Sequence, residues 1–401
     1  MQEAEQQSQG ESEHIQWWQR VDPALRWALG IYLIARVLVS AWAATAVSLA
    51  PVDVPYIGHP VYEVVHKAYP HSSRLLDLVL GAWFRWDTGW FIKVAMHGYA
   101  PDDGSTTVSP LYPLLIRWLG WLLGSEYLLA ALLISNLALV VGLILLYKLV
   151  RLDFPEDVAR RSVTFQVALP AGFFLLAGYT EALYLCLAIL SLYAARRSNW
   201  ALAGVAALLT SLARMQGWVL ALPLAYEALH QTRMHPVRAW RGLLAAAGGP
   251  VGTLSYSTYL ALSSLPGMSI TYQRDWKVHY TPPWTSVGMA INSLVTGQAS
   301  FQDVINTLIL LFSLALILVS MWKLRPTYWL YTATSQSIFL MGYLESEQLH
   351  SMMRYTLVLF PNVIALALLT RCRWASGVMI FIFVLLQAVL LGLFVHWVWV
   401  A

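Results

Sequence analysis

The sequence predicts an all-α integral membrane protein that crosses the bilayer many times. Of its 401 residues, 58% are hydrophobic and only 11% are charged, and the mean hydropathy is +0.59. A soluble domain carries about 25% charged residues. The 19 tryptophans and 20 tyrosines agree with this class, because both residue types favour the membrane–water interface. The two cysteines, Cys186 and Cys372, offer neither a disulfide framework nor a thiol metal site.

Seven apolar segments approach the length of about 20 residues that a membrane span needs. They are Trp27–Ala50, Leu128–Leu149, Leu243–Leu262, Val304–Met321, Tyr328–Tyr343, Tyr355–Leu369 and Val378–Val400. Two longer apolar stretches follow Arg161 and Arg196, and the first has 34 residues. As one helix it would measure roughly 50 Å, against a hydrocarbon core of about 30 Å. Because polar breaks interrupt both stretches at Gly178–Glu181 and Ala213–Gly217, we predict two helical hairpins and about eleven spans.

The distribution of basic residues orients these spans. With hairpins in place, one side of the membrane collects Arg20, Arg26, Lys148, Arg151, Arg160, Arg161, Arg196, Arg197, Arg233, Arg238, Arg241, Lys323, Arg325, Arg371 and Arg373. Short loops rich in Lys and Arg are cytoplasmic, so residues 1–26 are predicted to be a cytoplasmic tail. The segments 51–127 and 263–302, the hairpin tips and the turn Glu345–Arg354 then face the extracytoplasmic side.

The first extracytoplasmic loop, 51–127, is rich in aromatic and aliphatic residues and should be ordered. Charges alternate with apolar residues along Ser73–Met96, which indicates one or two amphipathic helices in the interface plane. Leu114–Leu123 is either a further interfacial helix or a short span, and a span there would reverse the sides assigned above. No linker separates a second domain, so residues 1–401 are predicted to form one domain.

The stretch Phe84–Pro113 is the candidate site, because it gathers polar groups within an apolar chain. Asp87 stands between Trp86 and Trp90, and a carboxylate flanked by indoles suits a site that handles a sugar. The plainer alternatives are that Asp87 caps a helix and that the tryptophans belong to an interfacial aromatic belt. Asp102 and Asp103 resemble a metal-binding carboxylate pair, although a solvated turn explains them as well.

Cations that flank apolar spans on the same side are candidates for binding a phosphate. Arg214 and Arg354 directly flank predicted spans, and Lys277 and His279 come next. The arginines could equally be snorkelling anchors. No Walker or Rossmann glycine pattern is present to hold a nucleotide, so a sugar donor should be lipid-linked. No cofactor is firmly implied, nothing points to a nucleic-acid partner, and His97, His279 and His350 lack ligand spacing.

Short motifs occur in order along most of the chain. They are R-W-D at 85–87 with H-G-Y at 97–99, P-L-Y-P at 110–113, P-A-G-F-F at 170–174, G-Y-T-E-A-L at 178–183, A-R-M-Q-G at 213–217, the segment from Trp276 to Trp284, and R-Y followed by F-P within 354–361. This ordered set resembles the PIG-V-type mannosyltransferases, a branch of the GT-C membrane glycosyltransferases. Val108 and Ser109 depart from the family pattern, which usually shows aromatic residues there.

The resemblance implies a GT-C-like fold and an inverting transfer of mannose or a related hexose. The donor would be a polyprenyl-phosphate sugar, and the acceptor a lipid- or glycan-bound hydroxyl on the extracytoplasmic side. By motif position Asp87 would be the general base, with Arg214, Arg354, Lys277 and His279 at the donor phosphate. Candidates for acceptor or sugar contact are Trp86, Trp90, Tyr99, Tyr179, Glu181 and Trp276. Glu181 could orient an acceptor hydroxyl or pair with an arginine.

Two other classes of function stay open. A lipid or glycan transporter would also have many spans, but it should show ionisable residues at mid-helix and a repeat relation between its halves. Here the charges gather at the outer ends of the spans, and Arg36 is the main exception. A non-catalytic membrane partner with the same fold would be expected to lack the Asp87 position. The compact loops suit a homologue in a bacterial or archaeal plasma membrane.

Overall fold

The computed structural model describes residues 22–50, 79–344 and 349–400, and their regular structure is almost entirely helical. The α-helices are α2 (Pro23–Leu49), α5 (Asp87–His97), α6 (Leu111–Leu122), α7 (Tyr127–Val150), α8 (Glu156–Ala168), α9 (Glu181–Arg196), α10 (Trp200–Ala213), α11 (Ala221–Gln231), α12 (Trp240–Ala246), α13 (Gly248–Leu262), α14 (Met268–Arg274), α15 (Pro283–Val295), α16 (Phe301–Lys323), α17 (Pro326–Phe339), α18 (Met352–Thr356), α19 (Phe360–Leu369) and α20 (Arg373–Val395). Short 3₁₀-helices are η1 (Gly81–Trp83), η2 (Ser105–Thr107), η3 (Gly172–Leu175) and η4 (Met215–Leu220).

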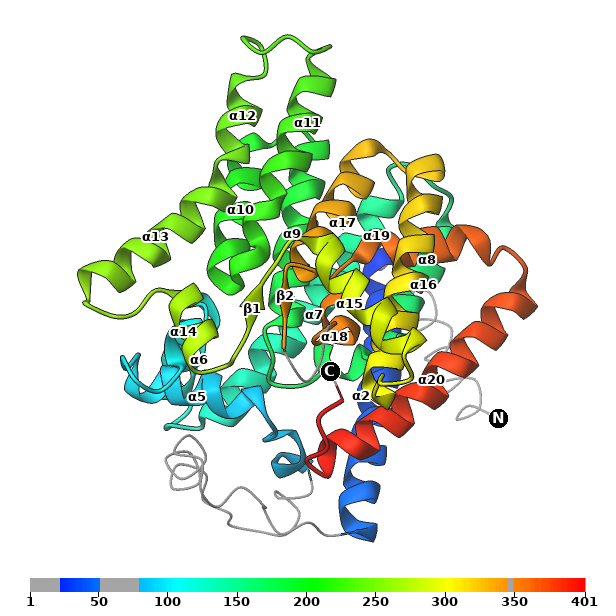
Figure 1. Cartoon of the computed structure of the whole chain (residues 1–401). Helices are drawn as coiled ribbons and strands as arrows, with labels where there is room; N and C mark the ends of the chain where they lie inside the picture. Colours follow the sequence, from blue (N-terminus) through cyan, green and yellow to red (C-terminus); the bar gives the residue numbers. More distant parts are fainter. Residues whose placement is uncertain (1–21, 51–78, 345–348, 401) are drawn as a thin grey trace, which may run out of the picture.

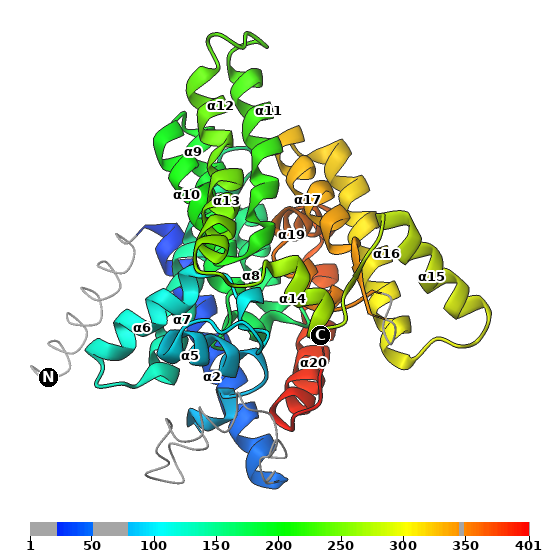
Figure 2. The ribbon, with the colours of Figure 1, turned by 60° about the vertical axis from the view of Figure 1, so that its left-hand side comes forward.

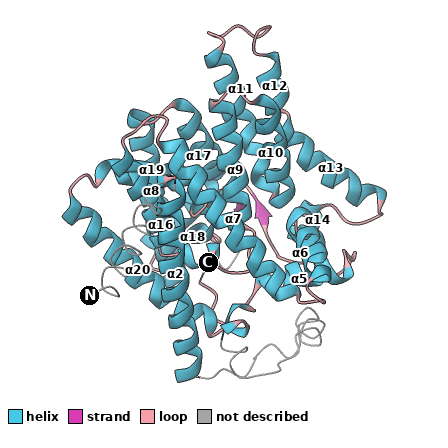
Figure 3. Ribbon diagram, turned by 180° about the vertical axis from the view of Figure 1, so that it is seen from behind, coloured by secondary structure: helices cyan, strands magenta, loops and turns pink. Residues whose placement is uncertain are grey.

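The helices pack into one body with a projecting pair at one end. Figure 1 and Figure 2 show α11 and α12 extending away from the body, while α2 and α20 lie side by side toward the opposite end. The strands β1 (His279–Tyr280) and β2 (Gly342–Tyr343) pair antiparallel and tie two loops together. Figure 3 shows how small this strand element is among the helices. The all-α prediction is confirmed for the residues that the structure describes.

Four of the described helices are long and apolar enough to cross a membrane, namely α2, α7, α16 and α20. Local sequence signals define their ends: the Asp22 side chain accepts a hydrogen bond from the Ala24 N–H at the start of α2, and Ser300 and Asp303 form a capping box at α16. Exposed Leu, Ile, Val and Phe side chains cover the outer faces of these helices. These surfaces fit an integral membrane protein, and the number of eleven spans stays a prediction.

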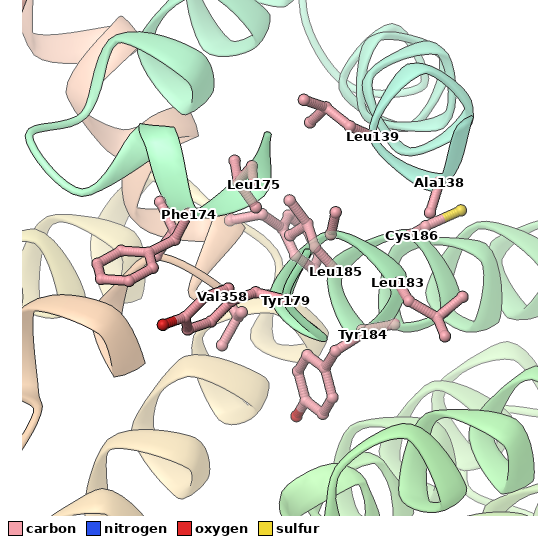
Figure 4. Packing of buried hydrophobic residues seen from close by; sticks show 14 of the residues in the cluster. Ala138, Leu139, Phe174, Leu175, Tyr179, Leu183, Tyr184, Leu185, Cys186 and Val358 are labelled. Atoms are coloured by element: carbon pink, nitrogen blue, oxygen red, sulfur yellow. The ribbon is translucent and has the colours of Figure 1, made fainter. Parts of the chain in front are cut away.

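The first predicted hairpin is interrupted at the expected place, but its tip is buried. After α8 ends at Ala168, the chain runs without α-helix until α9 begins at Glu181, and residues 171–180 are all buried. Figure 4 shows Phe174 and Tyr179 of this segment packed with Tyr184 and Val358. Buried backbone groups that leave a helix need other hydrogen-bond partners. The tip of this hairpin therefore lies inside the protein and not in solvent.

Polar side chains from neighbouring helices supply those partners. Arg36 and Asn136 both donate to the Leu176 carbonyl, at 2.9 and 3.1 Å. Gln387 of α20 donates to the carbonyls of Val167 and Leu169. Arg36 also lies over the Trp83 ring, with 4.8 Å from its guanidinium carbon to the ring centroid. Arg36, the exceptional charge in the first predicted span, thus donates a hydrogen bond to the unwound segment. This explains why an arginine lies within an apolar helix.

The second hairpin breaks at Arg214, between α10 and the 3₁₀ turn η4, as the sequence predicts. Two other predicted spans are also interrupted. Leu243–Leu262 divides into α12 and α13 at Ala247, and Tyr355–Leu369 divides into α18 and α19 before Phe360. Each of these helices is shorter than a bilayer span, so these parts of the chain pass through the protein as broken helices.

Two expectations for the first outer loop can be compared with the structure. The prediction of an amphipathic interfacial helix is wrong for α5, because its residues 88–95 are all buried. Helix α6 has 12 residues, which is about 18 Å and too short to cross a bilayer alone. Residues 51–78, which include the first part of the predicted amphipathic stretch, lie outside the described residues, as do Arg20, Glu345 and Glu347.

Close packing at the second hairpin predicts a large effect of one added methyl group. A Cβ on Gly217 would lie 2.3 Å from the Ser211 nitrogen, whereas a Cβ on Gly30 would meet nothing within 4 Å. Overpacking of this kind costs about 1–3 kcal/mol. We expect Gly217→Ala to lower the melting temperature of the detergent-solubilised protein by several degrees and Gly30→Ala to leave it unchanged. Equal melting temperatures for the two variants would contradict the packing at η4.

Candidate active site

A cavity of about 330 Å³ lies where the segments around α5 and α14 meet the broken helices. Its lining residues are Trp86, Asp87, Trp90, Phe91, Thr107, Val108, Ser109, Thr180, Ala213, Arg214, Met215, Gln216, Met268, Tyr272, Trp276, His350, Ser351, Arg354, Tyr355 and Trp399. The two segments are joined directly, since the hydroxyls of Thr106 and Thr271 lie 2.6 Å apart. The Tyr256 hydroxyl donates to the carbonyls of Thr106 and Val108, at 3.0 and 3.1 Å. These bonds give the cavity a fixed rim.

Asp87 is the first residue of α5 and faces an arginine that is distant in sequence. Its Oδ2 atom accepts a hydrogen bond of 2.6 Å from Nη1 of Arg354. The N-cap position of α5 is Trp86, and no side chain caps the helix there. The alternative that Asp87 serves as a helix cap is therefore wrong, and its carboxylate is available to the cavity that it lines.

Hydrogen bonds of the Tyr179 hydroxyl with the backbone of Arg85 and Asp87 hold the turn that contains Asp87. The backbone N–H of Asp87 donates to the Tyr179 hydroxyl at 3.2 Å, and this hydroxyl donates to the Arg85 carbonyl at 3.3 Å. Trp86 adopts a φ of +52°, a conformation that non-glycine residues rarely take. The surrounding bonds hold this tight turn, which sends Trp86 and Asp87 toward the cavity. Tyr179 is fully buried, so it positions the turn instead of contacting a sugar as expected.

A buried carboxylate joins the two arginines that flank the cavity. Glu181 is fully buried, and its Oε1 atom lies 2.8 Å from Nε of Arg354. The same oxygen accepts a short hydrogen bond from Nη1 of Arg214. Charges therefore alternate along a chain from Asp87 through Arg354 and Glu181 to Arg214. Of the two roles left open for Glu181, the geometry corresponds to pairing, and it pairs with both arginines.

Two pairs of tryptophans form part of the cavity wall. The ring centroids of Trp86 and Trp399 are 5.2 Å apart, and those of Trp90 and Trp276 are 5.3 Å apart. Such spacings are typical of favourable aromatic pairs. The prediction that Trp86, Trp90 and Trp276 share a site is thus consistent with the structure. Tyr99 does not line the cavity, because its hydroxyl donates to the Val108 carbonyl and its ring packs on Tyr256.

The two weaker candidates for phosphate binding lie outside the cavity. Lys277 donates from Nζ to the Arg274 carbonyl at 2.7 Å. His279 is exposed in strand β1, where its ring packs against Tyr343. Neither residue contributes to the lining. Their charge and their place on the predicted extracytoplasmic side suggested both of them, but the chain turns at Lys277, where φ is +55°, and leaves the cavity.

The carboxylate pair considered for a metal has other partners. Asp103 forms an ion pair with Lys93 and accepts the Ser105 N–H at 2.9 Å. Burial raises the pKa of the Asp103 carboxyl, but the hydrogen bonds from Lys93 and Ser105 outweigh it and hold the pKa below its usual value. Asp102 is exposed and lies 3.5 Å from Arg274. Within the described ranges no three His, Cys, Asp or Glu side chains are grouped to hold a metal ion.

Several lining residues were not identified from the sequence. They are Tyr272, His350, Tyr355, Gln216 and Trp399. Gln216 lies within the A-R-M-Q-G motif and Tyr355 within the R-Y motif, so the motifs already pointed to them. Trp399 gave no such signal, because the apolar stretch Val378–Val400 reads as a span to its end, whereas α20 ends at Val395.

The architecture defines a helical integral membrane protein with a charged, tryptophan-lined cavity. Residues 66–233 match the family profile described as "Mannosyltransferase (PIG-V)". The chain is also 28% identical over 226 residues to GPI mannosyltransferase 2 of Yarrowia lipolytica (strain CLIB 122 / E 150), which covers 55% of this chain and 60% of that protein. The chain thus spans three fifths of the curated relative's length. The resemblance to PIG-V-type mannosyltransferases is therefore confirmed.

Removing the charge of Glu181 should destabilise the protein strongly. Breaking a buried ion pair by neutralising one partner costs about 3–5 kcal/mol, and here the buried Arg354 and the partly buried Arg214 would lose their shared carboxylate. We expect Glu181→Gln to lower the melting temperature in detergent by more than about 5 °C.

The matched control is Glu156→Gln, which removes an exposed ion pair with Arg160 on α8. Exposed pairs contribute about 0–1 kcal/mol, so its melting temperature should stay close to that of the wild type. If Glu181→Gln melted like this control, Glu181 would not be the common partner of the two arginines.

Proposed function

We propose that the protein is an inverting glycosyltransferase that moves mannose, or a related hexose, from a polyprenyl-phosphate donor to a hydroxyl of a lipid or glycan acceptor. The observation that carries this proposal is the meeting of Asp87, Arg354 and Arg214 at one tryptophan-lined cavity. These residues come from three segments far apart in the chain. The family match and the name of the yeast relative support the sugar class.

The proposed reaction uses Asp87 as the general base. A carboxylate oxygen of Asp87 takes the proton from the acceptor hydroxyl as the hydroxyl oxygen attacks the anomeric carbon. The bond between this carbon and the phosphate oxygen breaks, and the electron pair leaves with the polyprenyl phosphate. Because a phosphate leaves as an anion, it needs cations and not a proton. Arg214 and Arg354 can supply this charge stabilisation.

One feature of the cavity and one of the sequence favour a lipid-linked donor. Met215, Met268 and Val108 contribute apolar lining beside the arginines, which suits the first units of a polyprenyl chain. The absence of a nucleotide-binding pattern in the sequence points the same way. No metal is included in the proposal, since the cations that it needs are arginines.

The proposed side of the membrane is the extracytoplasmic one. Two of the basic residues predicted to be cytoplasmic, Arg196 and Arg325, lie 3.7 and 3.4 Å from the buried Glu227. Neither of them lines the cavity. The cavity is built instead from segments that the positive-inside rule assigns to the outer side. A bacterial or archaeal plasma membrane fits the compact loops.

Transfer of radiolabelled mannose from polyprenyl-phosphate-mannose tests the donor class and the base together. The full chain in membrane vesicles would be supplied with this donor and a lipid extract of its own host as acceptor pool. We expect Asp87→Asn and Asp87→Ala to lower the rate by about 10²–10⁴-fold, because neither side chain can accept the proton.

Asp275→Asn is the control for this measurement, because Asp275 is a carboxylate of the outer loop that pairs with Arg274 and does not line the cavity. It should retain activity at equal expression. Transfer that survives Asp87→Asn would remove Asp87 as the base while leaving a glycosyltransferase. A wild type that transfers nothing from such donors would favour a transporter or a non-catalytic partner.

A further inference from the structure

We propose that Trp399 is an acceptor-binding residue, whose indole face contacts the ring of a sugar-like acceptor next to Asp87. This inference rests on the proposed transferase function and deepens it by naming the end of the cavity at which the acceptor binds. Trp399 lies outside the segment 66–233 that matches the family profile. Its role is therefore argued from the contacts in the structure alone.

The segment that carries Trp399 is firmly attached to the core. After α20 ends at Val395, Trp397 takes a φ of +63°, which turns the chain back toward the body of the protein. The buried Arg85 donates from Nε to the Val395 carbonyl at 2.8 Å. Its guanidinium also lies over the Trp397 ring, 4.9 Å from the centroid. The segment that follows α20 is thereby held against the core of the protein.

This attachment places Trp399 at the cavity wall beside the proposed base. Trp397 is buried, whereas Trp399 is partly exposed and belongs to the lining. The Trp399 ring centroid lies 5.7 Å from the guanidinium carbon of Arg354. Arg354 in turn donates to Asp87 at 2.6 Å, and Trp86, the neighbour of Asp87, packs edge-on against Trp399. Trp399 is thus separated from the base by one arginine.

The chain of alternating charges gives the cavity two different ends. Asp87 stands at one end and Arg214 at the other, with Arg354 and Glu181 between them. Arg214 lies over Tyr355, 5.6 Å from its ring centroid, while Arg354 lies over Trp399. The indole pair of Trp86 and Trp399 therefore belongs to the Asp87 end, and the end with Arg214 has the cation for a phosphate.

An inverting displacement requires this separation. The attacking hydroxyl and the departing group lie on opposite faces of the anomeric carbon. With the phosphate held at Arg214 and the base at Asp87, the acceptor must approach from the Asp87 end, where Trp399 lies. An indole offers a large, flat apolar surface that loses little conformational freedom on binding. Its face matches the C–H face of a pyranose ring, so the acceptor class is a pyranoside with a hydroxyl for attack.

The test compares Trp399→Ala and Trp399→Phe with Trp374→Ala in the full chain. Trp374 is a matched control, because it lies at the start of α20, is 76% exposed and does not line the cavity. The assay measures mannose transfer while either the host lipid extract or the polyprenyl-phosphate-mannose is varied. Release of mannose to water without extract reports the donor side alone.

We expect Trp399→Ala to raise the amount of extract needed for half-maximal transfer by about tenfold, the effect of losing one well-packed aromatic contact. The donor concentration for half-maximal transfer and the rate of mannose release to water should stay within about twofold of the wild type. The melting temperature should stay within a few degrees. Trp399→Phe should give an intermediate value, since a smaller ring keeps part of the contact. Trp374→Ala should behave as the wild type.

Three results would overturn the inference. The extract dependence of Trp399→Ala could equal that of the wild type, its donor half-saturation could rise instead, or transfer and release to water could fall together. If Trp399→Ala does not fold, Trp399→Phe decides by the same measurements. A wild type without any transfer overturns the proposed function as well, whereas a transferring wild type with an unaffected Trp399→Ala overturns only the role of Trp399.

Discussion

The interaction on which the site depends is the buried ion pairing of Glu181 with two arginines. A carboxylate cannot remain charged in a low-dielectric interior without opposite charges and hydrogen bonds. Here Arg354 and Arg214 approach the same Oε1 atom. Glu181 begins α9 and Arg214 follows the end of α10, whereas Arg354 lies within the short helix α18. One carboxylate thus brings the Y-T-E, A-R-M-Q-G and R-Y motifs together, and through Arg354 it also sets the place of Asp87.

Broken helices make this arrangement feasible within an apolar protein. A continuous helix satisfies its own backbone groups and offers only side chains to a site. The segment between α8 and α9 gives up that satisfaction and receives hydrogen bonds from Arg36, Asn136 and Gln387 instead. Because the chain is unwound there, the N-terminal end of α9 with Glu181 lies inside the protein. Arg36, which the sequence showed as an exception within an apolar span, is therefore explained by the unwound chain, as are Asn136 and Gln387.

Sequence patterns predicted the helix breaks and the charged site residues better than they predicted where individual side chains point. Length alone showed that the stretch after Arg161 could not be one span, and charge next to apolar spans singled out Arg214 and Arg354. By contrast, Tyr99 was assigned to the site through its motif and Lys277 through its charge, although their side chains bond elsewhere. The periodicity of α5 indicated an interfacial helix. The helix is buried instead, and the ion pair with Asp103 compensates the charge of its Lys93.

Trp399 could not have been found from the sequence, because its position depends on a contact between distant segments. Arg85 and the Val395 carbonyl are 310 residues apart. Their hydrogen bond fixes the place where the chain leaves α20, together with the contact of Arg85 with the Trp397 ring and that of His396 with the Ala50 carbonyl. Arg85 precedes Trp86 and Asp87, so the same side chain holds the turn of the proposed base and the segment of the proposed acceptor contact. The R-W-D motif accordingly combines three structural roles in sequence: Arg85 attaches the segment after α20, Trp86 forms part of the cavity wall and Asp87 lines the cavity. The motif by itself pointed to Trp86 and Asp87. The role of Arg85 is visible only in the structure, where the motif and the segment after α20 lie together.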